Sequence, residues 1–93
     1  MTSTLSPVYT NQKSFNNKAI VKEYTDKNGV QIKELTSYTT VVCVIENNKD
    51  FYRTWGGYSA TTMKHIHEFR LQNGLSPMGK KEWEQLPVTR NKY

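Results

Sequence analysis

The chain has 93 residues, and its 13 Lys and Arg against 8 Asp and Glu give a formal net charge of +5. A domain of this length buries only about 60–65% of its unfolded surface, so enclosing a large cofactor is costly and we expect none. The longest apolar run, Val41–Ile45, is far shorter than the about 20 residues of a membrane span. Because the N-terminus also lacks a signal-peptide pattern, we expect a cytoplasmic protein without a membrane partner.

The basic balance favours polyanionic partners, either nucleic acid or an acidic protein surface. Basic residues are spread along the whole chain, and residues 1–18 contain Lys13 and Lys18 but no acid. A net charge of this size is also ordinary in small proteins, where it serves only to keep them in solution. Both interpretations stay open.

Residues 1–18 differ in composition from the rest of the chain. They are rich in Ser, Thr and Asn, and Pro7 interrupts any helix. This composition predicts either a flexible arm or an edge strand at Val8–Thr10. The arm precedes one α+β domain of residues 19–93, and whether it is ordered stays open.

The next part of the sequence alternates as strands do. Asn28-Gly29 predicts a tight turn between strands at 19–24 and 30–35, because both residues tolerate a positive φ. The stretch Ser37–Ile45 is the best strand of the sequence, and its β-branched residues suit a central position covered on both faces. A turn and a short strand, Phe51–Trp55, follow.

Helical periodicity begins after the strands. Ser59 is predicted to cap a helix that runs to about Asn73. Ser76-Pro77 predicts the start of a second, shorter helix anchored by Trp83, and residues 88–93 are expected to form a loose tail. The fold class is therefore α+β: a small antiparallel sheet of three to four strands followed by two helices packed on one face.

Few residues are arranged for chemistry. His65 and His67 are two residues apart, so on a helix they point in different directions and cannot both ligate one metal. Cys43 lies in the expected central strand, where a free thiol behaves as a small hydrophobe. The glycines do not form a phosphate-binding loop. We therefore expect no metal site, no catalytic residues and no enzyme activity.

Binding is better supported than catalysis. Phe51, Tyr52, Arg53 and Trp55 place aromatic rings beside a cation, and such an arrangement stacks bases and neutralises phosphates. The alternative is that Phe51 and Trp55 enter the core while Arg53 spans its edge.

A second basic group is predicted across the two helices. Its members are Lys64, His67, Arg70, Lys80 and Lys81. With Tyr52 and Arg53 they make up the candidate binding residues. The alternative is an ordinary solvated face, since neither cluster is a specific motif.

Three segments carry a resemblance to a known group of proteins: Ser37–Val42, Gly57–Phe69 and Lys80–Trp83. Over residues 35–86 the chain resembles a poorly characterised family of short proteins from phages and plasmids of Gram-positive bacteria, which share an SYxT strand and a YSxTTxxHIxEF helix start. The resemblance implies an origin on a mobile genetic element. It implies no established activity, so no functional residue is carried over.

Small proteins of such elements often act by binding a host machine. We therefore expect a non-enzymatic protein that inhibits a host defence nuclease complex, an anti-CRISPR protein in the sharpest version, inside the bacterial host cell. Its basic face would seat against an acidic protein patch or a bound guide RNA and occlude the site. The alternatives are an accessory protein of the phage or plasmid that binds DNA or RNA directly, and a structural subunit. The target and the oligomeric state stay open.

Overall fold

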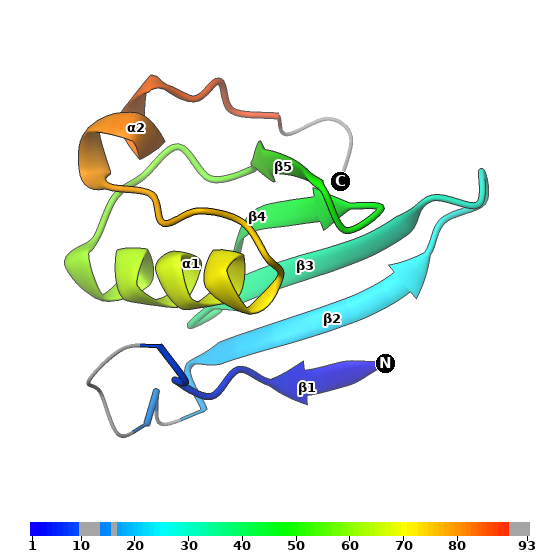
Figure 1. Cartoon of the computed structure of the whole chain (residues 1–93), viewed down its shortest axis with the longest axis horizontal. Helices are drawn as coiled ribbons and strands as arrows, with labels where there is room; N and C mark the ends of the chain where they lie inside the picture. Colours follow the sequence, from blue (N-terminus) through cyan, green and yellow to red (C-terminus); the bar gives the residue numbers. More distant parts are fainter. Residues whose placement is uncertain (10–13, 16, 90–93) are drawn as a thin grey trace.

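Five strands and two helices make up the computed structural model, which describes residues 1–9, 14–15 and 17–89. The strands form one antiparallel sheet in the order β1-β2-β3-β4-β5 (Figure 1). The α+β class is confirmed, whereas the expected three to four strands are too few. The elements are β1 (Thr2–Thr4), β2 (Ala19–Thr25), β3 (Gln31–Ser37), β4 (Thr40–Glu46), β5 (Asp50–Arg53), α1 (Ala60–Gln72) and α2 (Lys80–Gln85).

Strand β1 is the additional strand, and its three polar residues are all exposed. Pairing holds it in place, since Thr2 lies opposite Lys22 of β2 and the ammonium of Met1 donates a 2.7 Å hydrogen bond to the Glu23 carbonyl. The expected edge strand at Val8–Thr10 does not form over Val8 and Tyr9, and Thr10 lies outside the described residues. The segment after β1 also reaches the core: Leu5 and Phe15 are buried there.

The hairpin between β3 and β4 corrects the expected strand Ser37–Ile45. Strand β3 ends at Ser37, Tyr38 and Thr39 form the turn, and β4 begins at Thr40. The sequence gives no warning because the turn contains no Gly, Asn or Pro, and Tyr38 adopts a φ of 59°. The strand β4 that follows is central in the sheet, and its residues from Val42 to Glu46 are buried.

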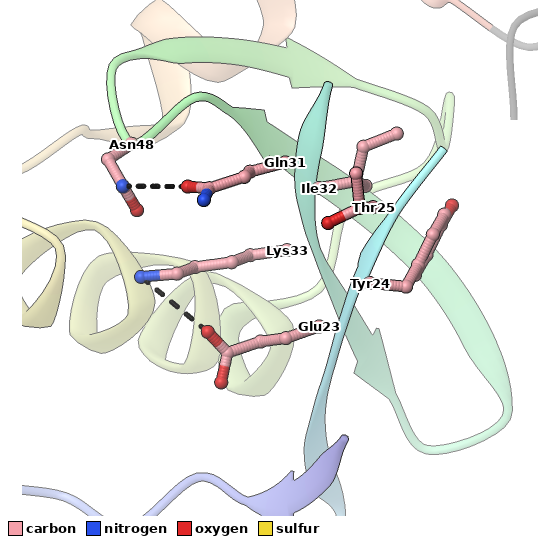
Figure 2. Close-up of a pocket in the computed structure, with 7 residues that line it drawn as sticks. All are labelled: Glu23, Tyr24, Thr25, Gln31, Ile32, Lys33 and Asn48. Atoms are coloured by element: carbon pink, nitrogen blue, oxygen red, sulfur yellow. Dashed lines mark hydrogen bonds and ion pairs between the residues drawn. The ribbon is translucent and has the colours of Figure 1, made fainter. Parts of the chain in front are cut away.

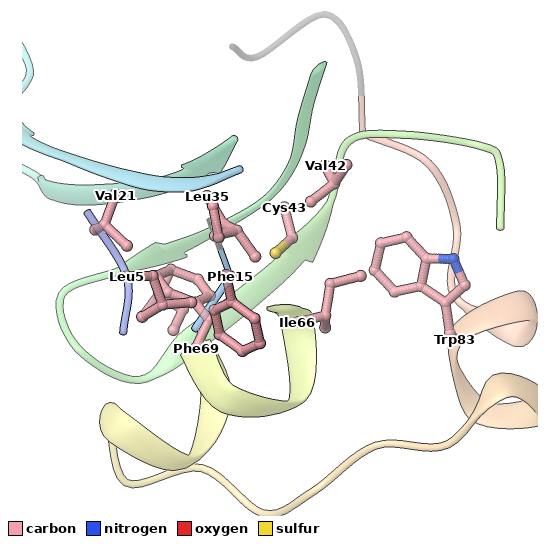
Figure 3. Close-up of a cluster of buried hydrophobic side chains, with 11 residues drawn as sticks. Leu5, Phe15, Val21, Leu35, Val42, Cys43, Ile66, Phe69 and Trp83 are labelled. Carbon is pink, nitrogen blue, oxygen red and sulfur yellow. The ribbon is translucent and has the colours of Figure 1, made fainter. Parts of the chain in front are cut away.

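The core lies between the sheet and the helices. Figure 3 shows Ile66 of α1 and Trp83 of α2 pointing toward the buried side chains of the sheet, among them Leu35 and Cys43. Both helices therefore contribute to one apolar cluster. Neither is long and apolar enough to cross a membrane, in the part of the chain that is described.

The two helices differ in how well the sequence locates them. Helix α1 begins after Ser59, whose hydroxyl accepts the Thr62 N–H at 3.0 Å, and ends at Gln72, as expected. Helix α2 begins later than expected, after Gly79 rather than at Ser76-Pro77. The Glu82 carboxylate accepts the Gly79 N–H, which caps α2 there and leaves 75–79 as a linker.

The segment after α2 returns to the sheet. Val88 forms a parallel bridge with Arg53 of β5, and the Thr89 N–H donates to the Arg53 carbonyl at 2.7 Å. Val88 and Thr89 are therefore fixed against β5, which corrects the expectation of a loose tail at 88–93 for these two residues. Residues 90–93 lie outside the described part.

Candidate binding groove between the two helices

A groove of about 280 Å³ lies between α1 and the start of α2. On α1 it is lined at positions 60, 63, 64 and 67, the spacing that places residues on one face of a helix. The linker and the first residue of α2 provide the opposite wall. The lining residues are Tyr58, Ala60, Met63, Lys64, His67, Met78, Gly79 and Lys80; together they are called the α1–α2 groove.

The packing of the helices explains why this groove has an apolar floor. Helix α1 directs Ile66 and Phe69 into the core, and α2 is anchored by Trp83. Met63 and Met78 pack against that core without being enclosed by it. Their flexible thioether side chains therefore remain accessible from the groove, where such side chains adapt to a partner's shape.

The charges around the groove are positive. Lys64, His67 and Lys80 line it, and no carboxylate is among the lining residues. The Lys80 ammonium lies 4.8 Å from the centre of the Tyr58 ring and 4.0 Å from a carboxylate oxygen of Glu84, with both charged side chains largely exposed. The first turn of α1 also has no acidic residue, so the positive end of its dipole is not neutralised there.

Three of the seven candidate binding residues, Lys64, His67 and Lys80, come together in this groove. Lys81 is exposed on α2 beside Lys80 but does not line the groove. The remaining candidates, Arg53, Arg70 and Tyr52, lie elsewhere.

Arg53 is a structural residue, which corrects its assignment to a binding surface. It is only 6% exposed, and its guanidinium stacks 4.5 Å from the centre of the Trp83 ring. It donates hydrogen bonds of 2.8–3.3 Å to the backbone carbonyls of Trp55, Gly57, Trp83 and Leu86. These contacts hold β5, the loop before α1 and α2 together and leave the guanidinium no freedom to bind a partner.

Arg70 is half-buried and holds the linker. Its guanidinium lies 4.5 Å from the centre of the Phe51 ring, and its Nε donates to the Ser76 carbonyl at 2.8 Å. Burial lowers the pKa of this guanidinium from its ordinary value. Arg70 therefore supports the groove from behind the linker rather than lining it.

Tyr52 lies on the opposite face of the sheet from the groove. Successive side chains of a strand alternate between faces, and its neighbour Arg53 faces the helices. Tyr52 is paired with Val44 of β4 on the face opposite the groove, where Val44 is fully buried and Tyr52 half-buried. One contact surface cannot include both Tyr52 and the helix cations, which corrects that part of the expected binding face.

The sequence did not single out the apolar part of the groove. Met63 lies four residues before His67, so an apolar residue on the same helix face as a predicted binding residue was the available signal. Met78 had no such signal, because its position depends on the linker conformation.

A second cavity, of about 350 Å³, lies beside the β2–β3 hairpin (Figure 2). Its polar side chains already bind one another: the Lys33 ammonium lies 3.8 Å from the Glu23 carboxylate, and Asn48 donates to Gln31 at 3.4 Å. Lys33 also donates to Asn73, the residue that follows α1, at 2.7 Å. The cavity is therefore a poorer candidate site than the α1–α2 groove.

Two residues with nucleophilic side chains are enclosed. Ser37 Oγ lies 2.8 Å from His65 Nδ1 and 2.9 Å from Thr62 Oγ1, but Ser37 is 3% and His65 1% exposed. Burial lowers the pKa of His65 and raises the pKa of the Cys43 thiol above its ordinary value. These groups stabilise the contact between α1 and the sheet, and a substrate would not reach them.

The fold and the groove define a small α+β domain with a basic, methionine-floored surface between its two helices. The chain belongs to a family of unknown function, DUF8033, whose sequence profile matches residues 3–85. Comparison with curated proteins and with solved structures finds no significant match.

Proposed function

We propose that this protein is a non-enzymatic binding protein of a mobile genetic element that inhibits a host defence nuclease complex, as anti-CRISPR proteins do. The α1–α2 groove is the contact surface, and inhibition follows from occluding a nucleic-acid site or blocking a required motion. The observation that carries the binding function is the combination in one groove of an apolar floor, Met63 and Met78, with the cations Lys64 and Lys80.

The burial of the reactive side chains supports binding over catalysis. Ser37, His65 and Cys43 are each at most 3% exposed. A nucleophile and its base must reach a substrate, so these residues are unsuited to covalent catalysis in this conformation. The groove, in contrast, is open, and Tyr58, Met63 and Met78 in its lining are of residue types enriched at protein interfaces.

The host defence target is supported by the resemblance to short phage and plasmid proteins and by the basic charge. Defence nucleases that carry a guide RNA present its negative phosphates, which attract a small protein of net charge +5. The test is a pull-down of tagged protein from a Gram-positive host lysate, with and without nuclease treatment. We expect one nuclease complex that survives the treatment and whose activity falls when the protein is added.

A direct nucleic-acid binder is the second candidate, favoured by the excess of Lys and Arg. It predicts recovery of nucleic acid alone, lost on digestion, and an affinity that falls steeply with salt because counterions are released. Recovery of nucleic acid without any host protein would therefore replace the first proposal by this one.

A further inference from the structure

We infer that the α1–α2 groove binds a segment of a protein in which one or two apolar side chains are flanked by carboxylates. This inference specifies the partner chemistry of the proposed binding surface and rests on that surface being the contact site. It excludes a nucleic acid as the ligand of the groove, although both kinds of ligand are negatively charged.

The size and floor of the groove favour an apolar side chain. Its volume of about 280 Å³ is at the lower limit of the about 300–1,000 Å³ that is typical of small-molecule sites. Met63 and Met78 come from two different elements and both also contact the core, so the floor is supported from below. Such a floor provides dispersion contacts and adapts to the shape of an inserted Leu, Met or Phe.

The rim of the groove favours carboxylates beside that side chain. Lys64 and Lys80 come from the two facing walls, and His67 lies one helical turn from Lys64. No lining residue is acidic, so an acidic residue on one side of the apolar anchor meets Lys64. One on the other side meets Lys80, where it replaces the exposed ion pair with Glu84 at 4.0 Å. Charge complementarity of this kind fixes the register of a bound segment and speeds its association.

A nucleic-acid base is a poorer fit than an apolar side chain. Single-stranded nucleic acids are bound mainly by stacking bases on aromatic rings. Tyr58 and His67 are the aromatic residues among the lining residues, and the Lys80 ammonium already lies over the Tyr58 ring at 4.8 Å. The floor itself, Met63 and Met78, consists of thioether side chains, which offer no stacking surface.

The three methionines of the chain supply an internal probe, because Met63 and Met78 line the groove whereas Met1 is at the N-terminus, beside Glu23. A library of random 12-residue peptides is displayed and selected on the whole protein, and the most enriched peptide is titrated into protein labelled at the methionine methyl groups. We expect enriched peptides to combine Asp or Glu with Leu, Met or Phe. The methyl signals of Met63 and Met78 should shift, and that of Met1 should not.

Two charge-reversed variants provide the matched comparison. Lys64→Glu with Lys80→Glu should weaken peptide binding by about 10-fold or more, because two like charges then face the carboxylates. Lys27→Glu with Lys49→Glu makes the same change in net charge at exposed turn residues away from the groove and should weaken binding by less than about 3-fold. All four lysines are exposed, and the unchanged methyl spectrum of each free variant verifies its fold.

Four results would overturn the inference: no enriched peptide, enriched peptides without acidic residues, binding that leaves the Met63 and Met78 methyls unshifted, or tighter binding of a 12-nucleotide single strand at those methyls. The proposed function fails separately. If acidic peptides bind in the groove but no nuclease complex is captured or inhibited, the partner chemistry stands and the inhibitor proposal falls. If a nuclease complex is inhibited equally by both charge-reversed variants, the inhibitor proposal stands and the groove is not its contact site.

Discussion

Arg53 illustrates how burial gives a charged side chain a structural role instead of a binding role. In the sequence it is a cation between aromatic residues, which is typical of a binding strand. In the fold its guanidinium donates to four backbone carbonyls, of which those of Gly57 and Trp83 also accept from the Trp83 indole N–H and the Leu86 N–H. The sequence does not show which carbonyls lie near Arg53, because they belong to segments up to 33 residues away along the chain. The sequence predicted the alternation of side chains along β5 and offered a position of Arg53 at the core edge as an alternative, but not its hydrogen bonds.

Substitution of Arg53 should therefore affect stability. Arg53→Ala removes the donor to several carbonyls, and a buried unsatisfied group costs about 1–3 kcal/mol, so we expect the free energy of unfolding to fall by about 2–4 kcal/mol. Lys49→Ala, an exposed turn residue, should change it by less than about 0.5 kcal/mol. Denaturant unfolding measures both. Equal small effects would show that the Arg53 contacts contribute little.

Tyr38 occupies a backbone conformation that the chain elsewhere gives to asparagine. Its φ of 59° is comparable to the 51° and 63° of Asn47 and Asn48 in the β4–β5 turn. A bulky residue with a positive φ is strained. Tyr38 is 49% exposed, and the centre of its ring lies 5.9 Å from that of the His65 ring. Tyr38→Asn should raise the free energy of unfolding by about 0.5–1 kcal/mol. Thr39→Asn is the control, since the φ of Thr39 is not positive. A loss of stability in Tyr38→Asn would mean that the contact between the Tyr38 and His65 rings outweighs the backbone strain.

His65 makes stability depend on pH. Burial lowers the pKa of His65 below its ordinary value, so the unfolded chain binds a proton more readily than the folded one. The neutral form thus stabilises the fold above a pH of about 6.5, and this contribution is lost as the pH falls below it, at up to about 1.4 kcal/mol per pH unit. In the described part of the chain the ring contacts Ser37, Phe15 and Tyr38, none of which is acidic.

The measurement is the unfolding midpoint in denaturant between pH 7 and pH 5. The midpoint should fall on acidification, and His65→Asn, which keeps an acceptor near Ser37, should reduce that fall. His67→Asn changes a groove residue instead, and the fall of the unfolding midpoint on acidification should persist in this variant. An identical pH dependence in the two variants would assign the effect to other groups.

At the level of elements, Glu68 ties the N-terminal segment to α1. Its carboxylate is fully buried and accepts the Tyr9 N–H at 3.0 and 3.2 Å, while Gln72 bridges it to the Ser6 carbonyl. Glu68→Gln replaces one of the two accepting oxygens by an NH2 donor, which weakens acceptance from the Tyr9 N–H and the Gln72 amide. Glu68→Gln should therefore speed amide exchange over residues 1–9 by about 10-fold or more, with α2 unaffected. Glu84→Gln, on the exposed side of α2, should have no such effect; unchanged exchange in Glu68→Gln would mean that β-pairing alone holds the segment.

The sequence predicted elements best where local signals and packing agree. Helix α1 was located by its serine cap and its periodicity, and β2 and β3 by the turn at Asn28-Gly29. The predictions from the sequence were wrong where tertiary contacts determine the bounds of an element. Strand β1 is polar on every position and exists through pairing with β2, and the start of α2 depends on Glu82 capping Gly79 rather than on Ser76-Pro77. The groove combines one predictable helix face with a linker that no local signal describes.

At the level of the whole molecule, the helices divide the surface into two unlike faces. Both helices lie on one side of the sheet (Figure 1) and contribute to the core there. The α1–α2 groove lies between them. Tyr52 belongs to the other side. The net charge of +5 is a property of the whole chain, whereas a specific contact requires cations and apolar groups in one place. Of the expected site residues, only those that line the α1–α2 groove lie beside such apolar groups.

The most direct test of the account is whether the groove, rather than the overall charge, governs partner binding. Wild-type protein, Lys64→Glu with Lys80→Glu, and Lys27→Glu with Lys49→Glu are compared in the same nuclease-treated host lysate, with the amount of captured nuclease complex and its residual activity as readouts. We predict capture and inhibition by the wild type and by the turn variant, and a loss of both in the groove variant. Equal loss in the two variants would reduce the interaction to net charge, and retention in the groove variant would contradict the assignment of the groove as the contact surface.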